Sequence, residues 1–297
     1  MKKLFVAMLL VLAMAIPAYA IVPEFNKSNI EVGAEYNYSH QDIESVNPIG
    51  ISVGDWLSAD LTNKTSNVKA WSFLATLGYK ISPQLTPYMI LGNGQINLDQ
   101  ELSGSASIGD WSGSIPILTT QLRGASGFQF GGGAKGELME FNNGVTIGYD
   151  TRWTTVTVDS NDKQAMFLGS SCLTADNDIE ATMSVFNLDV AVSKYYDLTE
   201  KVTAEDGTVT TKKKYMVEGI TPFVGGRYTH SDLNVKNDIT IGEGHHSIGL
   251  STESNTQGNM ISAIGGVAIK INKSLVASVG GIIGQENGVN VKCIYNF

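Results

Sequence analysis

The last nine residues, VNVKCIYNF (289–297), carry the clearest structural pattern of the chain. Apolar or aromatic side chains occupy every odd position, and three of the four even positions are polar. Successive side chains of a β-strand point to opposite faces, so this period of two predicts a strand with one apolar and one polar face. A soluble sandwich would alternate in the same way, so the pattern alone leaves the environment of the strand open.

The same alternation recurs along the chain. It is clear in some segments and weaker in others, and together they predict about ten strands. The clear segments are residues 30–38, 67–81, 127–138, 145–154 and 186–193, and the weaker ones lie near 87–98, 220–231, 257–271 and 274–284.

The connections between these segments fall into two groups. Three are short (82–86, 139–143 and 272–273), and four are long and polar (40–66, 99–125, 158–180 and 232–256). When the chain is followed through ten strands, the short connections share one side and the long ones share the other. Outer-membrane barrels have this asymmetry, with short periplasmic turns and long external loops. The predicted fold is therefore all-β, a transmembrane antiparallel up-and-down barrel of about ten strands.

The segment 198–216 departs from this scheme. Its centre, TAEDGTVT (203–210), predicts a hairpin with an Asp-Gly turn. The hairpin either extends two barrel strands or adds a pair, so twelve strands is an alternative count, as is eight.

The N-terminus predicts export. Lys2 and Lys3 precede thirteen apolar residues, and the sequence PAYA (17–20) follows. This order indicates a signal peptide whose A-x-A site, Ala18 and Ala20, is cleaved after residue 20. The apolar run is too short for a membrane-spanning helix, which needs roughly 20 residues. We expect residues 1–20 to be removed and residues 21–297 to form a single barrel domain.

Charge and side-chain chemistry limit the function classes. Without the signal peptide, 18 basic residues face 29 acidic ones, which argues against a nucleic-acid partner. The glycines at 131, 133 and 136 match a dinucleotide-binding spacing, but no helix follows them. The pair His245-His246 beside Glu243 lacks an evident third ligand. We expect no cofactor, no metal and no enzymatic activity, and free thiols at Cys172 and Cys293.

The C-terminal strand resembles the signal that the barrel assembly machinery reads in bacterial outer-membrane proteins. The matching residues are Val289, Val291, Cys293, Tyr295 and Phe297. The chain as a whole resembles small Gram-negative outer-membrane barrels, the opacity-type proteins and the OmpA membrane domain, and the stretch TPFVGGRY (221–228) is similar to their strand openings. The resemblance implies an outer-membrane location with contacts to the lipid bilayer and lipopolysaccharide, and it implies no substrate.

Charged residues on the polar faces predict the content of the lumen. A Lys or Arg facing lipid at mid-depth costs about 2–4 kcal/mol, so such residues belong inside the barrel. We expect them to pair across a narrow interior and fill it, with a selective solute path as the alternative. The predicted lumen charges are Glu31, Glu35, Lys69, Asp150, Arg152, Asp189, Lys194 and Arg227.

Two pairs at the predicted outer rim suggest a further reading. His230 and Asp232 have the spacing of residues on one strand face, as do Asp99 and Glu101. A histidine–acid set beside an acidic pair is similar to omptin-type outer-membrane proteases, in which the histidine would activate a water. The preferred hypothesis is a structural barrel or narrow porin-like pore with long surface loops. The alternatives are a surface adhesin with an extracellular ligand and an omptin-like rim protease.

Overall fold

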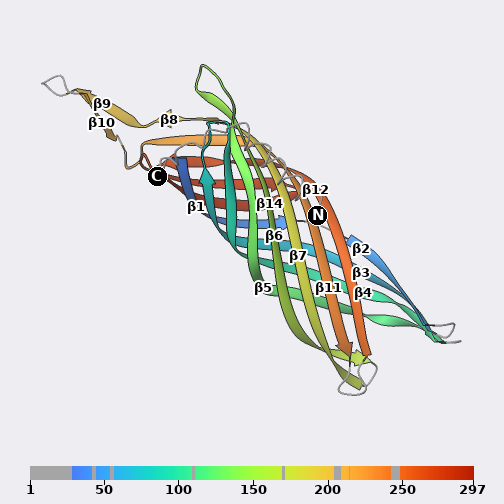
Figure 1. The fold of residues 1–297 in the computed structure, drawn as a ribbon. Helices are drawn as coiled ribbons and strands as arrows, with labels where there is room; N and C mark the ends of the chain where they lie inside the picture. The colour runs from blue at the N-terminus through green and yellow to red at the C-terminus, as the bar shows by residue number, and fades with distance from the viewer. Residues whose placement is uncertain are drawn as a thin grey trace, which may run out of the picture.

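Ten antiparallel strands close into a β-barrel in the computed structural model (Figure 1). The structure describes residues 29–41, 45–53, 57–108, 111–168, 171–203, 209–213, 215–241 and 248–297, so the signal peptide with Ala18 and Ala20 lies outside the described residues. The barrel strands are β1 (Ile30–Gln41), β3 (Leu57–Tyr79), β4 (Thr86–Ile108), β5 (Trp111–Glu140), β6 (Val145–Leu168), β7 (Ser171–Lys194), β11 (Gly219–Ile241), β12 (Ile248–Lys270), β13 (Leu275–Gly284) and β14 (Glu286–Asn296). This confirms the predicted fold class and the count of ten. No helix in the described ranges is long and apolar enough to cross a membrane.

The two terminal strands close the barrel. β1 pairs with β14 on one side and with β3 on the other. The amide of Phe297 donates a hydrogen bond to the carbonyl oxygen of Ile30 at 3.1 Å, so the last residue lies beside the start of the first strand. The short connections after β3, β5 and β12 lie at this end of the barrel, which we call the turn end. The opposite end is called the extended end.

For the described residues of the four long polar segments, the prediction of loops was wrong. Most of their described residues belong to strands β3 to β7, β11 and β12, which are 23–30 residues long. A barrel strand needs only about 9–11 residues to span a bilayer. Strands β1, β13 and β14, with 10–12 residues, have that length. The long strands therefore continue well past the short ones, and the polar composition of these continuations is typical of loops.

The predicted hairpin around residues 203–210 is present as a separate two-stranded sheet. β9 (Thr199–Thr203) pairs with β10 (Val209–Lys213), while the turn residues 204–208 lie outside the described residues. The hairpin projects away from the barrel at the turn end (Figure 1). The short strand β8 (Tyr196–Asp197) connects it to the barrel by pairing with β11. The hairpin is thus an addition to the ten barrel strands.

The barrel wall divides at the extended end. The pairing of β5 with β6 reaches only as far as Gln129 and Val156. Beyond that point, the described residues form one sheet of β2 (Ser45–Val53), β3, β4 and β5 and a second sheet of β6, β7, β11 and β12. Figure 1 shows the two sheets running to separate tips.

A hydrophobic core holds the two sheets together where they leave the barrel. Its members come from six strands, and several, such as Leu122, Leu233 and Ile96, have no exposed surface. Their burial between facing sheets is the arrangement of a β-sandwich core. The core residues are Val68, Ile96, Leu98, Leu122, Ala125, Val156, Val158, Ile179, Ala181, Met183, Leu233 and Val235.

The outer surface of the barrel carries an apolar belt. Outward-facing Phe73, Ile261 and Ile283 are each about two-thirds to three-quarters exposed, at 66%, 73% and 73%. Aromatic pairs border this belt at both ends, with Tyr38 and Trp71 in ring contact toward the extended end. A continuous exposed apolar surface of this kind requires a non-aqueous neighbour.

We predict that Leu233→Ala lowers the free energy of unfolding by about 2–5 kcal/mol, because it leaves a cavity in the core between the two sheets. Guanidinium unfolding of the refolded protein in detergent, followed by tryptophan fluorescence, measures this change. The control is Leu188→Ala, a truncation on the outer belt where detergent fills the space. Equal losses from the two variants would contradict the assignment of a packed core at the extended end.

Candidate functional site

The interior of the barrel contains most of the predicted lumen charges. On β1, the inward positions Glu31 and Glu35 alternate with the exposed outward residues Val32 and Tyr36. The structure also places Asp150, Arg152, Asp189 and Arg227 inside, where they line a common cavity with the two glutamates. The side chain of Glu35 is almost completely buried, with 2% of its surface exposed.

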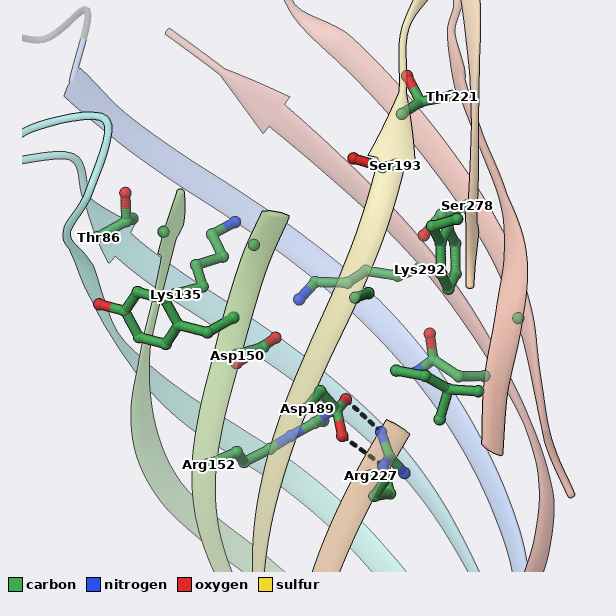
Figure 2. Close-up of a pocket in the computed structure, with 18 of the residues that line it drawn as sticks. Thr86, Lys135, Asp150, Arg152, Asp189, Ser193, Thr221, Arg227, Ser278 and Lys292 are labelled. Atoms are coloured by element: carbon green, nitrogen blue, oxygen red, sulfur yellow. Dashed lines mark hydrogen bonds and ion pairs between the residues drawn. The ribbon is translucent and has the colours of Figure 1, made fainter. Parts of the chain in front are cut away.

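Two arginine–carboxylate pairs form the centre of this interior. Arg227 donates from Nε and Nη2 to the two carboxylate oxygens of Asp189, each at 2.7 Å (Figure 2). Arg152 donates from Nη1 to Glu35, which also accepts a hydrogen bond of 2.8 Å from Asn290. Buried ions need such partners, because an unpaired charge in the interior is strongly destabilising. We call these two pairs the ion-pair layer.

Three further residues belong to the polar interior, and the sequence analysis did not name them as lumen residues. Lys135 pairs with Glu31 at 2.6 Å, and the ammonium of Lys292 lies 3.6 Å from Glu35 Oε2. The hydroxyl of Tyr88 donates to Asp150. Lys135 and Lys292 alternate with apolar or small residues on their strands, so the same alternation could have identified them.

The predicted placement of Lys69 and Lys194 in the lumen was wrong. Lys69 has the same parity as the outward residues Trp71 and Phe73, since the inward residues of β3 here are Val68 and Ala70. It faces outward beside the aromatic border, where the free-energy cost of an outward-facing charge is small.

Lys194 has the same parity as Val190 and Val192, which are exposed on the outer belt. It lies near the turn end of β7, with its ammonium 5.6 Å from the centre of the Tyr196 ring. An aromatic ring attracts a cation at this distance, so Lys194 has a favourable place outside the lumen.

Two cavities flank the ion-pair layer. The larger, about 450 Å³, opens toward the turn end and is bordered there by Lys80, Pro83 and Glu137. The smaller, about 80 Å³, lies between the ion-pair layer and the core of the extended end. Arg152 and Arg227 line both cavities, so the ion-pair layer separates them. We call the larger cavity the vestibule.

The proposed assembly signal forms the outer face of β14. Val289, Val291 and Tyr295 are each a little less than half exposed, and Cys293 is an exposed free thiol on the same face. The rings of Tyr295 and Phe297 are in edge contact, with centroids 4.9 Å apart. Cys172 pairs in register with Phe167 of β6, and the state of its thiol lies outside what the structure describes.

The two rim pairs are not brought together. Thr229 and Ser231 are buried inside, so His230 and Asp232 lie on the outer face of β11, and His230 Nδ1 is 2.8 Å from Asn259 Oδ1. Strands β5, β6 and β7 separate β11 from β4 in the sheet.

On β4, Ile96 and Leu98 point into the core, which leaves Asp99 and Glu101 on the outer face. Asp99 accepts a hydrogen bond of 3.0 Å from Asn67. Side chains on outer faces of separate walls cannot activate a common water, so the structure does not assemble the site that the omptin resemblance suggested.

The glycines at 131, 133 and 136 have a packing role. A Cβ at Gly131 would collide with the carbonyl oxygen of Trp153, and one at Gly136 would collide with that of Gln84. Close approach of neighbouring backbone therefore explains the spacing. Residues 243, 245 and 246 lie outside the described residues, and the described ones contain no group of three His, Cys, Asp or Glu that could hold a metal ion.

Comparisons with known proteins give structural likenesses only. No protein-family model and no curated protein sequence matches the chain. The chain is similar to the outer membrane protease OmpT from Escherichia coli, with 9% identity, a TM-score of 0.45, and 93% of this chain and 99% of that chain covered. It is also similar to the beta domain of the Bordetella autotransporter BrkA, with 12% identity, a TM-score of 0.38, and 91% of this chain and 100% of that chain covered. A third similar structure is the transport unit of the autotransporter AIDA-I from Escherichia coli, with 10% identity, a TM-score of 0.31, and 93% of this chain and 92% of that chain covered. The barrel assignment rests on the strand pairings of the chain itself.

We predict that Arg227→Met lowers the free energy of unfolding by about 3–5 kcal/mol, since it leaves Asp189 buried without its cation. The measurement is guanidinium unfolding in detergent, with Lys69→Met on the outer face as the matched control. Adding Asp189→Leu to Arg227→Met should recover much of the loss. A double variant as unstable as the single one would contradict the pairing.

Proposed function

We propose that the chain is an integral outer-membrane protein whose interior is closed to solutes. The apolar belt between aromatic borders supports insertion in a bilayer, because lipid is the natural neighbour of such a surface. The strand asymmetry supports an orientation with the turn end in the periplasm and the extended end outside. The outer face of β14, ending at Phe297, would present the assembly signal, and lipopolysaccharide would contact the outer part of the belt.

One observation carries the proposal of a closed interior. Within the ion-pair layer, the Arg152–Glu35 pair crosses the lumen from β6 to β1, and the Arg227–Asp189 pair joins the neighbouring strands β11 and β7 beside it. The twelve-residue hydrophobic core fills the passage beyond this layer. A solute path would have to displace two buried ion pairs and then pass through a packed apolar core. Displacing the ion pairs would leave buried charges without partners. Opening the core would disrupt an interior packed as densely as an organic crystal. A structural barrel is therefore favoured over the narrow porin-like pore.

We predict that pure refolded protein produces no conductance steps in planar lipid bilayers. The closed interior gives the reason, since neither ions nor water have a continuous path along it. Insertion is verified separately by heat-dependent gel mobility and by protease protection in liposomes. Regular conductance steps from inserted protein would overturn the closed-barrel proposal and restore the pore.

A second candidate function is surface interaction, and the extended end favours it. Seven barrel strands continue past the belt and form two sheets with outer faces directed away from the membrane. The outward residues Asp159, Asp178, Glu180, Asp238 and Glu253 are exposed on the second sheet. Rigid paired strands offer a defined surface to an extracellular ligand, and the acidic outer face would suit a basic one.

We predict that replacing residues 159–179 by a tight turn reduces attachment of expressing cells to a basic extracellular surface, because it removes the outer part of β6 and β7. The measurement is attachment of intact cells to polylysine-coated and collagen-coated wells at matched surface expression. A substitution in the turn 141–144, at the opposite end of the barrel, serves as the control. Attachment that is unchanged by the shortening would dismiss the adhesin candidate.

A further inference from the structure

We propose that the vestibule is a binding site for a small neutral saccharide that enters from the turn end. The vestibule has a volume of about 450 Å³, within the roughly 300–1,000 Å³ of ligand pockets in proteins. The sealed interior on its other side would make it a closed-ended pocket. This binding site is a function additional to the proposed structural role. Binding requires the vestibule and does not require that the barrel be closed to solutes.

The wall formed by β11, β12 and β13 contains an aromatic platform. Phe223 points inward from β11 and pairs in register with Gly266, which pairs in turn with Gly280. A Cβ at Gly266 would lie 2.7 Å from the tip of the Phe223 ring, and one at Gly280 would lie 3.2 Å from it. The ring therefore lies over two glycines and lines the cavity. An aromatic side chain that lines a cavity in this way can pack against the C–H face of a sugar ring.

Hydroxyl groups surround the platform. Ser193 is the cross-strand partner of Phe223 on β7, and Thr221 lies on β11 in the neighbouring inward row. Ser278 on β13 pairs in register with Lys292 of β14. Figure 2 shows Ser193, Thr221 and Ser278 along one side of the cavity, with Lys292 reaching toward its middle. Hydroxyls donate and accept hydrogen bonds, as sugar hydroxyls do.

Lys292 provides a donor for the same ligand. Its ammonium is 3.6 Å from Glu35 Oε2, beyond hydrogen-bond distance, and 5.6 Å from the centre of the Tyr88 ring. The side chain is mostly buried, with 14% of its surface exposed. An ammonium has three donors, so Lys292 can donate to a ligand oxygen in the vestibule while Glu35 compensates its charge.

The charge balance of the lining favours a neutral ligand over an anion. Five carboxylates and five cationic side chains line the vestibule. Lys135 pairs with Glu31, Arg152 with Glu35 and Arg227 with Asp189, so three of the five cations already have close carboxylate partners. A phosphate or carboxylate would have to compete with them. A saccharide would use the platform, the hydroxyls and Lys292 without adding net charge.

The test is isothermal titration of refolded protein in detergent with maltose, N,N'-diacetylchitobiose and inorganic phosphate. We expect saturable binding of at least one disaccharide with a Kd of about 1 mM or tighter, and none of phosphate. Phe223→Leu and Lys292→Met should each weaken binding about tenfold or more. The matched controls Phe73→Leu and Lys69→Met, on the outer face, should bind as the parent does.

Heat-dependent gel mobility establishes that each variant is folded. Ser278→Val serves as a further vestibule variant if Lys292→Met fails to fold, and it should also weaken binding. The inference is overturned if neither disaccharide binds, if phosphate alone binds, or if folded Phe223→Leu binds as tightly as the parent. Conductance through the barrel would contradict the closed-interior proposal only. The saccharide site would still be tested by the same titrations, because they measure binding and not conductance.

Discussion

A closed antiparallel barrel directs every second side chain into its interior. The rest of this structure depends on how the charged and polar groups at those inward positions find partners. Charges at inward positions need partners there, because lipid outside and protein inside both penalise an isolated ion. Arg152 and Arg227 meet this requirement with Glu35 and Asp189, which come from distant parts of the chain. The Arg152–Glu35 pair joins β6 to β1 across the lumen, whereas Arg227 and Asp189 are register partners on the neighbouring strands β11 and β7. The pair that crosses the interior keeps its charges buried and also obstructs the lumen.

Past the ion-pair layer, the same alternation is used differently. Inward positions such as Val68, Leu122 and Leu233 are apolar, and they pack into one core. This packing allows the long strands to continue after β1, β13 and β14 have ended, because two facing sheets need a shared apolar interior in water. The structure thus changes from a cylinder with an apolar outer belt and a polar interior to a sandwich with an apolar interior.

The vestibule is the part of the interior that neither arrangement fills. Small inward residues on β12 and β13, including Gly266 and Gly280, make room for the tip of the Phe223 ring, which borders the cavity. Three of the cations around the space are paired with carboxylates, and much of the remaining chemistry is aromatic and hydrogen-bonding. That combination is why a neutral polyhydroxylated ligand suits the space better than an ion.

The sequence by itself determined the fold class and indicated about ten barrel strands and a hairpin around residues 203–210, because alternation and turn residues are local signals. It left open whether that hairpin extends two barrel strands or adds a pair. Tertiary structure alone decided that residues such as 99–108 and 111–125 continue as strands, since their partners lie on neighbouring strands and their polar composition is typical of loops. It also assigned Lys69 and Lys194 to the outside and joined Lys292 to Glu35. Register and pairing across the interior depend on residues far apart in the chain, so a period of two can show that a side chain points inward without showing what it meets there.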